Sequence, residues 1–505
     1  MLDWKLASKN ILSNYGMFIA KMFVGLLALP ICLNAFGVEI YGLYLICFGL
    51  SSSMATFDFG GSKSVFRYVV EHNSDKNETK FTEALSVGIT FNILSSFLIT
   101  VALLLLGYYS NNLFSLTKAT ESISFPLFAL AAINSAILTF GTIPVNILNG
   151  NNNFHSRNLV QIIPLSATLI LLTYLSFNKG FSVINFSLLM VCISTLSLAL
   201  DLLLVRRKKL LQGIPIKLKL NNTIFRSTNI VYNYRLFLLS LVGFLAIQAD
   251  RLIIASFFSV ASVAIYAIIT KPYFLLKGLL ATSYPVIQPQ LSKYNMQQNR
   301  EDFNDFTSRL IRSSFVLFLS GISFISIFFE EALWIWLRSA DYNNHTVWGV
   351  LMLLGLGITV LYSPFYRTLF YTDKVKNILN FSFISVSINL LISIILTSYI
   401  GFQGVIIGTT TQIILEFFYF NHLAKNELAV NLKMIYTKRL VVATLSIILF
   451  SIIIYILKMW YGGSHFVLTL IALFTICMLA TIIFYFLRVE KIHLLFQRKK
   501  EISFQ

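Results

Sequence analysis

Six ionisable side chains inside long apolar runs of this sequence are candidate site residues, because a charge there is costly unless it faces protein or water. They are Lys21, Asp250, Arg251, Lys271, Lys277 and Glu416. Four of the six are basic, and ammonium and guanidinium groups are the usual donors to phosphate oxygens. We therefore expect Lys21, Arg251, Lys271 and Lys277 to bind an anionic group such as a pyrophosphate.

The two basic residues at 271 and 277 are not equivalent. Their spacing of six residues places them about 120° off a common helix face. One of them is therefore expected to point elsewhere. For Lys277 the alternative is a side chain that reaches towards the membrane surface or forms an ion pair within the bundle.

The acidic residues have two readings each. Asp250 is either an ion-coupling group or a charge partner of Lys21 or Lys271 that holds helices together. Glu416 is either a proton or cation site or a packed polar contact, and packing is the favoured interpretation. Asp201 lies near the end of an apolar run. It is expected to meet the adjacent basic residues 206–209.

The elements that position these residues must be membrane helices. The chain has 505 residues, of which 57% are apolar and 12% charged, whereas soluble domains carry about a quarter charged residues. A helix crosses a bilayer with about 20 mostly apolar residues. We find fourteen such runs, at 10–34, 38–58, 82–107, 123–148, 158–178, 181–205, 236–257, 260–288, 313–332, 346–371, 378–400, 402–424, 439–458 and 465–487. The sequence therefore predicts an all-α integral membrane protein with about 14 transmembrane helices.

The distribution of basic residues predicts the orientation of these helices. The chain has 39 Lys and Arg against 21 Asp and Glu, a net charge of +18. With the amino terminus inside, 31 of the 39 fall in inner connections or tails, 4 in outer connections and 4 within spans. Positive charge accumulates on the cytoplasmic side of membrane proteins. Both termini are therefore predicted to be cytoplasmic, and the excess charge mostly reflects topology rather than nucleic-acid binding.

A weak internal repeat predicts two lobes. NYGMF from Asn14 corresponds to NYRLF from Asn233, an offset of 219, and Pro144 corresponds to Pro364, an offset of 220. FGVEIYGLYLI from Phe36 corresponds to FSVASVAIYAII from Phe258, an offset of 222. Six helices per repeat give both copies the same orientation, so two six-helix lobes related by a parallel pseudo-two-fold axis are expected. The predicted segments are 1–205 for the first lobe, 206–235 for a basic cytoplasmic linker, 236–424 for the second lobe, and 425–505 for two further helices with a basic tail.

Nothing in the connections indicates catalysis. The outer loops are short, and the inner loops are basic and polar without a Gly-rich phosphate-binding pattern. Four cysteines, Cys32, Cys47, Cys192 and Cys477, lie in apolar runs without CxxC spacing, which is typical of small core side chains. No enzyme activity, metal or cofactor is expected.

Three motifs carry a resemblance to a known family. They are GVEIYGLYLI at 37–46, FDFGGSKSVFRYV at 57–69 and QADRLIIASFFSVASVAIYAI at 248–268. They resemble the polysaccharide biosynthesis transporters, the Wzx-type O-antigen flippases, within the superfamily of multidrug, oligosaccharidyl-lipid and polysaccharide exporters. This sequence differs from the family in helix number, because many members have twelve helices and fourteen are predicted here. The role of the last two predicted helices is therefore open.

The resemblance implies a flippase in the bacterial inner membrane. Its substrate would be a polyprenyl-pyrophosphate-linked oligosaccharide, moved across the membrane by alternating access for lipopolysaccharide or related polysaccharide biosynthesis. The implied partners are membrane lipids and other glycan assembly proteins, such as a polymerase or chain-length regulator; no nucleic acid is expected, and the protein would work as a monomer. Two alternatives stay open: an ion-coupled exporter of small molecules, and a membrane-embedded glycan polymerase or transferase.

Overall fold

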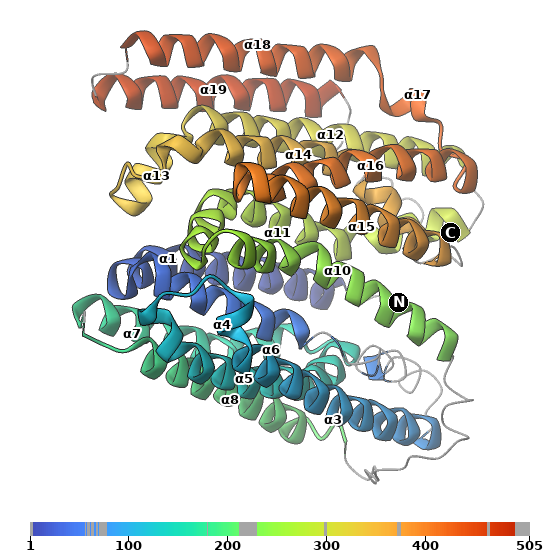
Figure 1. The fold of residues 1–505 in the computed structure, drawn as a ribbon. Coiled ribbons are helices and arrows are strands. Elements are labelled where there is room, and N and C mark those ends of the chain that lie inside the picture. Colours follow the sequence, from blue (N-terminus) through green and yellow to red (C-terminus); the bar gives the residue numbers. More distant parts are fainter. Residues whose placement is uncertain are drawn as a thin grey trace. The chain divides into compact units, whose positions relative to one another are not determined.

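The described part of the chain is built from helices. The computed structural model describes residues 4–55, 57, 61, 65, 66, 69, 78–178, 180–211, 230–296, 300–370, 375–461 and 465–489. Most of the motif at 57–69 and residues 212–229 of the predicted linker lie outside this set. The first helices are α1 (Trp4–Met54), α3 (Glu78–Tyr108), α4 (Ser110–Leu113), α5 (Lys118–Gly150), α6 (Phe154–Val160), α7 (Ile162–Phe177), α8 (Val183–Arg207), α10 (Ile230–Phe257) and α11 (Val260–Met296) (Figure 1).

The remaining described elements lie between Arg300 and Val489. They are α12 (Arg300–Ile327), α13 (Phe329–Leu337), the 3-10 turn η1 (Asn343–His345), α14 (Thr346–Phe370), α15 (Val375–Ile400), α16 (Gln403–Glu427), α17 (Leu432–Ile435), α18 (Lys438–Tyr461) and α19 (His465–Val489). Helices predominate because a backbone in lipid must satisfy its polar groups within its own segment.

The prediction of membrane helices is confirmed. Eleven helices within the described residues are long and apolar enough to cross a membrane. One of these stretches, Leu12–Met54, covers the first two predicted spans. The two spans are separated at Gly37, which leaves the helical conformation with φ 79° and ψ 165°. This positive φ suits glycine, which has no Cβ to clash with the backbone. Helices α16 and α19 occupy the predicted spans at 402–424 and 465–487.

The helix boundaries follow the repeat offset found in the sequence. Helix α8 and helix α16 differ by 220 residues at both their first and their last residues. Helices α5 and α14 end 220 residues apart, and each contains a proline, Pro144 or Pro364, six residues before its end. Proline is tolerated in membrane helices because neighbouring groups satisfy the freed carbonyl.

The chain divides into two compact units. Unit 1 comprises Met1–Ile268 and Ser382–Val405, and unit 2 comprises Ile269–Phe381 and Ile406–Gln505. Three helices, α11, α15 and α16, pass from one unit into the other. The lobe boundaries that the repeat predicts stay a prediction, because contact density and repeat symmetry are different criteria.

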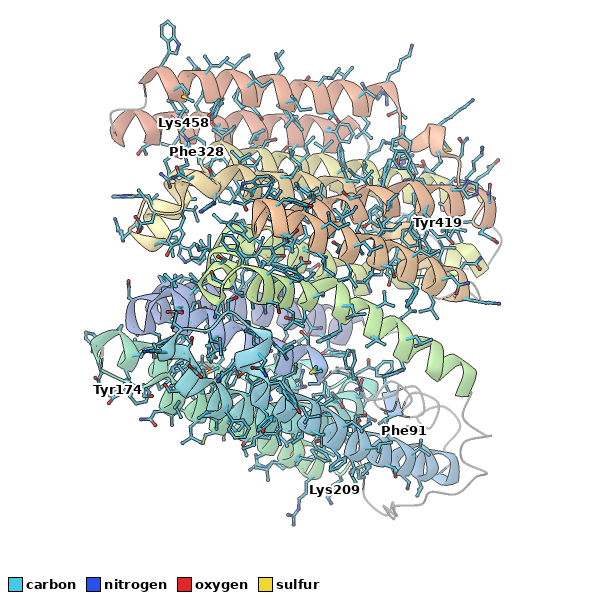
Figure 2. All side chains as sticks on the ribbon, viewed as in Figure 1. Phe91, Tyr174, Lys209, Phe328, Tyr419 and Lys458 are labelled. Carbon is cyan, nitrogen blue, oxygen red and sulfur yellow. The ribbon has the colours of Figure 1, made fainter. Side chains whose placement is uncertain are left out.

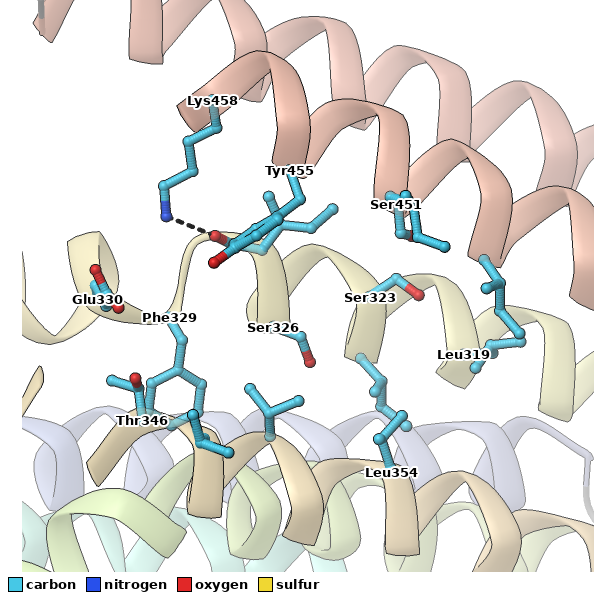
Figure 3. A pocket seen from close by; sticks show the side chains of 16 residues that line it. Leu319, Ser323, Ser326, Phe329, Glu330, Thr346, Leu354, Ser451, Tyr455 and Lys458 are labelled. Carbon is cyan, nitrogen blue, oxygen red and sulfur yellow. Dashed lines mark hydrogen bonds between the residues drawn. The ribbon is translucent and has the colours of Figure 1, made fainter. Parts of the chain in front are cut away.

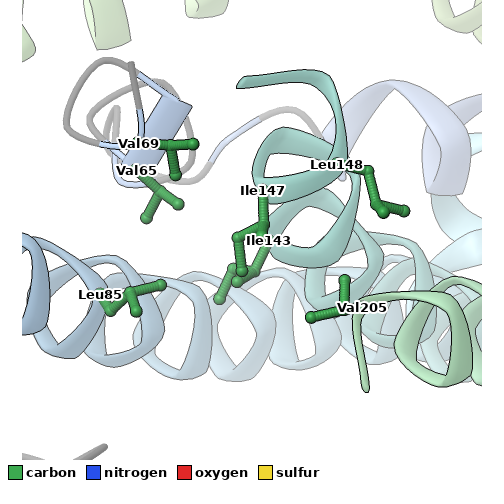
Figure 4. Close-up of a cluster of buried hydrophobic side chains, with 7 residues drawn as sticks. All are labelled: Val65, Val69, Leu85, Ile143, Ile147, Leu148 and Val205. Atoms are coloured by element: carbon green, nitrogen blue, oxygen red, sulfur yellow. The ribbon is translucent and has the colours of Figure 1, made fainter. Parts of the chain in front are cut away.

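Unit 1 is held by apolar packing and by polar contacts between helices. One buried cluster joins α3, α5, α8 and a segment before α3; its members are Val65, Val69, Leu85, Ile143, Ile147, Leu148 and Val205 (Figure 4). The Asn92 amide donates to the Thr139 carbonyl at 2.9 Å and ties α3 to α5. The Asn134 amide donates to the Ser51 hydroxyl at 2.9 Å and ties α5 to α1. Such polar contacts supplement van der Waals packing where lipid supplies little hydrophobic drive.

Unit 2 is organised around α12, which packs against α14, α18 and α19. Helices α18 and α19 run side by side (Figure 1). The Lys458 ammonium of α18 contacts the Glu331 carboxylate at 2.8 Å and donates to the Ile327 carbonyl at 2.8 Å. This ion pair fastens the last helix pair to the end of α12 and the start of α13.

Candidate functional site

Lys21 lies on a polar stripe of α1 that faces α6. Residues 10, 14 and 21 share one side of the helix, because they are separated by about one and two turns. The Asn14 Oδ1 accepts from the Asn158 amide at 2.7 Å, and the Asn10 Oδ1 accepts from the His155 backbone N–H at 3.1 Å. The Lys21 side chain is exposed, and within the described residues it makes no hydrogen bond or ion pair. It lies within electrostatic range of Arg157 and Asp201.

Asp201 forms a buried ion pair next to Lys21. Its side chain is 3% exposed, and its Oδ2 accepts from Arg157 Nε at 3.3 Å. Its Oδ1 accepts from the Gln161 amide at 3.0 Å, and Gln161 Oε1 in turn accepts from the Ser197 hydroxyl at 2.7 Å. Arg157 and Gln161 are one helical turn apart and therefore reach the same carboxylate.

The prediction that Asp201 meets residues 206–209 is wrong. All four of those basic side chains are exposed, and Lys209 projects away from the helices in Figure 2. Asp201 instead turns inward, where Arg157 and Gln161 satisfy both carboxylate oxygens. Sequence reasoning assigned Arg157 to the topology charges of an inner connection, but it belongs to the apolar stretch Phe154–Phe177.

Arg251 lies against the second half of α1. Its Nη1 donates to the Leu45 carbonyl at 3.5 Å and to Gln248 Oε1 at 3.3 Å. The guanidinium covers Gly49 and leaves no room for a side chain there. The Gln248 amide also donates to the Ser53 hydroxyl at 2.5 Å. Arg251 and Gln248, one turn apart on α10, thus connect this helix to α1.

Asp250 points to a different neighbour from Arg251. Its Oδ2 accepts from the Tyr266 hydroxyl of α11 at 2.8 Å, and both side chains are buried. Pairing of Asp250 with Lys21, one of the two predicted charge pairs, is not found, because Lys21 forms no ion pair within the described residues. Pairing with Lys271 stays a prediction.

In unit 2, Lys277 is exposed and contacts Tyr273 of its own helix. The ammonium donates to the Tyr273 hydroxyl at 3.1 Å and lies 5.2 Å from the ring centroid. Lys271 is half-buried one turn and a half earlier. The structure therefore gives Lys277 the local contact that a side chain at a helix surface adopts.

Glu416 of α16 has two donors. The Tyr362 hydroxyl of α14 donates to Oε2 at 2.5 Å, and the Gln412 amide donates to Oε1 at 2.8 Å. The Tyr362 ring stacks on Phe420 with centroids 5.6 Å apart. Sequence reasoning did not single out Tyr362 or Gln412; the spacing of four residues on α16 could have indicated Gln412.

A cavity of about 450 Å³ opens between α12, α14 and α18 of unit 2 (Figure 3). Its wall is mainly apolar; the polar side chains that line it include Ser323, Ser326, Ser451 and Glu330, with Lys458 at one end. None of the six predicted residues lines it. Within the described residues, no group of three or more His, Cys, Asp or Glu side chains could hold a metal ion.

Comparison with known proteins shows the fold. No family model matches the chain, and no curated protein matches it in sequence. The solved structure of the lipid II flippase MurJ in an inward closed conformation is 18% identical, with a TM-score of 0.70 over 96% of this chain and 100% of that chain.

Two further structures belong to transporters of the MOP superfamily. A multidrug resistance MATE transporter of the MOP superfamily, inward-facing, is 13% identical, with a TM-score of 0.61 over 82% of this chain and 98% of that one. A MOP superfamily transporter from Pyrococcus furiosus is 12% identical, with a TM-score of 0.60 over 85% and 96%. This chain is therefore a multi-pass membrane protein with the fold of the MOP superfamily transporters, a fold shared by MurJ and the MATE exporters.

Proposed function

We propose that this protein is a flippase that moves a polyprenyl-pyrophosphate-linked oligosaccharide, such as an O-antigen repeat unit, across the bacterial cytoplasmic membrane. Two facts support the proposal. The chain shares its fold with the lipid II flippase MurJ and with multidrug resistance MATE transporters. The intramembrane charges of this chain are mostly basic, which suits an anionic head group.

Lys21 is the observation that carries the proposal. An ammonium group inside a membrane span costs several kcal/mol unless it faces water or a counter-charge. Lys21 is exposed and has no ion-paired carboxylate among the described residues. An anionic ligand that binds Lys21 during transport explains why an ammonium group without an ion-paired carboxylate is present at this position.

The charge of the site distinguishes substrates within this fold. The Pyrococcus furiosus transporter is described as having a binding pocket of reversed polarity that suggests a different function. Pocket charge therefore varies among proteins of this fold. Among the six candidate residues, the bases Lys21, Arg251, Lys271 and Lys277 outnumber the acids Asp250 and Glu416. In the proposed cycle the pyrophosphate enters from the cytoplasmic side, the prenyl chain stays in lipid, and alternating access releases the glycan outside.

The proposal is tested by neutralising three of the bases together. A Lys21→Gln, Arg251→Gln, Lys271→Gln variant should insert into the membrane at normal levels but abolish surface glycan in a strain that lacks the native gene. Lys118→Gln, which removes an exposed charge at the start of α5, is the control and should restore glycan fully. Normal surface glycan in the triple variant would refute the proposal.

An ion-coupled exporter of small molecules is the second candidate. The observation that favours it is the Glu416 carboxylate, held by Tyr362 and Gln412 in unit 2. Such a carboxylate could exchange a proton or cation during transport. In this case deletion of the gene should lower tolerance to toxic cations and leave surface glycan unchanged. A Glu416→Gln variant should then behave like the deletion.

A further inference from the structure

Besides Lys21, unit 1 holds a second cation, Arg157, most of whose N–H donors make no hydrogen bond to a described protein group. Arg157 uses only Nε on Asp201. Within the described residues, no protein group accepts from its two terminal nitrogens, and its side chain is 22% exposed. A guanidinium carries five N–H donors in a planar fork that matches phosphate geometry. Most of this fork is therefore available to a ligand.

Lys21 and Arg157 lie on helices that pack together, because the face of α1 that carries Lys21 binds α6 through Asn14–Asn158 and Asn10–His155. The two like charges interact electrostatically, and Asp201 attracts Lys21 as well as Arg157. One carboxylate and two cations together leave a local charge of about +1. This surplus beside an exposed ammonium favours the binding of an anion.

The second predicted repeat carries no charge at the positions equivalent to these residues. At the repeat offset of 220, the positions equivalent to Arg157 and Asp201 are Asn377 and Asn421. At the offset of 219 that relates the first helices, the position equivalent to Lys21 is Ser240. The charges at 21, 157 and 201 are therefore specific to the first repeat, and the second repeat has neutral polar residues at the equivalent positions.

We infer that Lys21 and Arg157 form an anion site for a diphosphate on unit 1, with Asp201 as the positioning residue of Arg157. The buried carboxylate takes Nε and fixes the plane of the guanidinium, and the Gln161–Ser197 contact fixes the carboxylate. The terminal nitrogens of Arg157 and the ammonium of Lys21 then bind phosphate oxygens. The identification of the anion as a diphosphate rests on the proposed function.

The test is calorimetric titration of the purified full-length protein with inorganic pyrophosphate. Lys21→Gln and Arg157→Gln should each weaken binding about tenfold, the loss expected for one charge-assisted contact. Arg206→Gln removes an exposed charge near the end of α8 and should leave the affinity unchanged. Unchanged binding in both Lys21→Gln and Arg157→Gln, or an equal loss in Arg206→Gln, would overturn the inference.

Asp201→Asn separates positioning from simple charge. The substitution makes the site more positive, so charge alone predicts tighter binding. Loss of the fixed guanidinium predicts binding at least threefold weaker, as a consequence of a disordered fork. Tighter binding would remove the positioning role. Lys21 is exposed, so Lys21→Gln keeps the inference testable even if Asp201→Asn does not fold.

The site and the proposed function fail in different ways. If deletion of the gene leaves surface glycan intact while the protein binds pyrophosphate through Lys21 and Arg157, the anion site is supported and the proposed glycan substrate is refuted. If deletion abolishes surface glycan while Lys21→Gln and Arg157→Gln bind pyrophosphate normally, the proposed function is supported and the anion site is refuted.

Discussion

Gly42 of α1 should tolerate no side chain, although it lies within a helix. A Cβ at this position would stand under 3.0 Å from the carbonyl oxygen of Val260, the first residue of α11, and 3.0 Å from its carbonyl carbon. Real Cβ atoms do not approach so closely. Because the obstacle is backbone and not the end of a flexible side chain, the two helices must separate by about 1 Å to restore ordinary contact.

The cost of Gly42→Ala can be estimated from its surroundings. Leu43, Ile254 and Val263 next to this contact are fully buried, so the separation loosens a close-packed region. Overpacking of this kind costs about 1–3 kcal/mol, and we expect the upper end because neither backbone can rotate away. Gly16→Ala is the matched control on the same helix: nothing lies within 4 Å of its added Cβ. It should stabilise by about 0.8 kcal/mol through helix propensity.

The assay is thermal unfolding of both variants in detergent at one fixed scan rate, because unfolding of such proteins is often irreversible. The unfolding entropy of a chain of this length is about 1 kcal/mol/K. Gly42→Ala should therefore melt about 3 °C below the parent protein and Gly16→Ala about 1 °C above it. Equal shifts in the two variants, or a stabilised Gly42→Ala, would refute the close approach of α1 and α11.

Two further predictions concern polar contacts. A double-mutant cycle on Arg157 and Asp201, with neutral amide replacements, should give a coupling energy of about 1–3 kcal/mol because the Asp201 carboxylate is buried. The pair Asp305 and Arg309 on α12, whose carboxylate is partly exposed, should give about 0.3–0.5 kcal/mol. Equal couplings, measured by thermal unfolding, would show that burial of the carboxylate does not strengthen the first pair. Tyr362→Phe removes one donor to the α16 carboxylate and should lower the unfolding free energy by about 1–3 kcal/mol, and an unchanged melting temperature would show that this contact does not hold α14 to α16.

Much of the fold was predictable from local sequence features. Each membrane span is one continuous apolar run that is long enough to cross lipid. Its position along the chain therefore follows from the local composition alone. Gly37 and Gly42 of the GVEIYGLYLI motif also have local meaning: one turns the chain and the other lets a neighbouring helix approach. The sequence pattern marked both glycines without showing which task each performs.

The sequence by itself determined the membrane class, the helix positions, the repeat offset and the basic character of the intramembrane charges. These properties depend on the order of residues along one segment. Tertiary structure decided which charges have partners. Arg157 and Asp201 are 44 positions apart, and Tyr362 and Glu416 are 54 apart. Helix periodicity indicates which face carries a side chain, but only the packing of helices shows what lies opposite that face. Lys21 makes no ion pair within the described residues, Arg157 binds Asp201 on another helix, and Arg251 connects two helices.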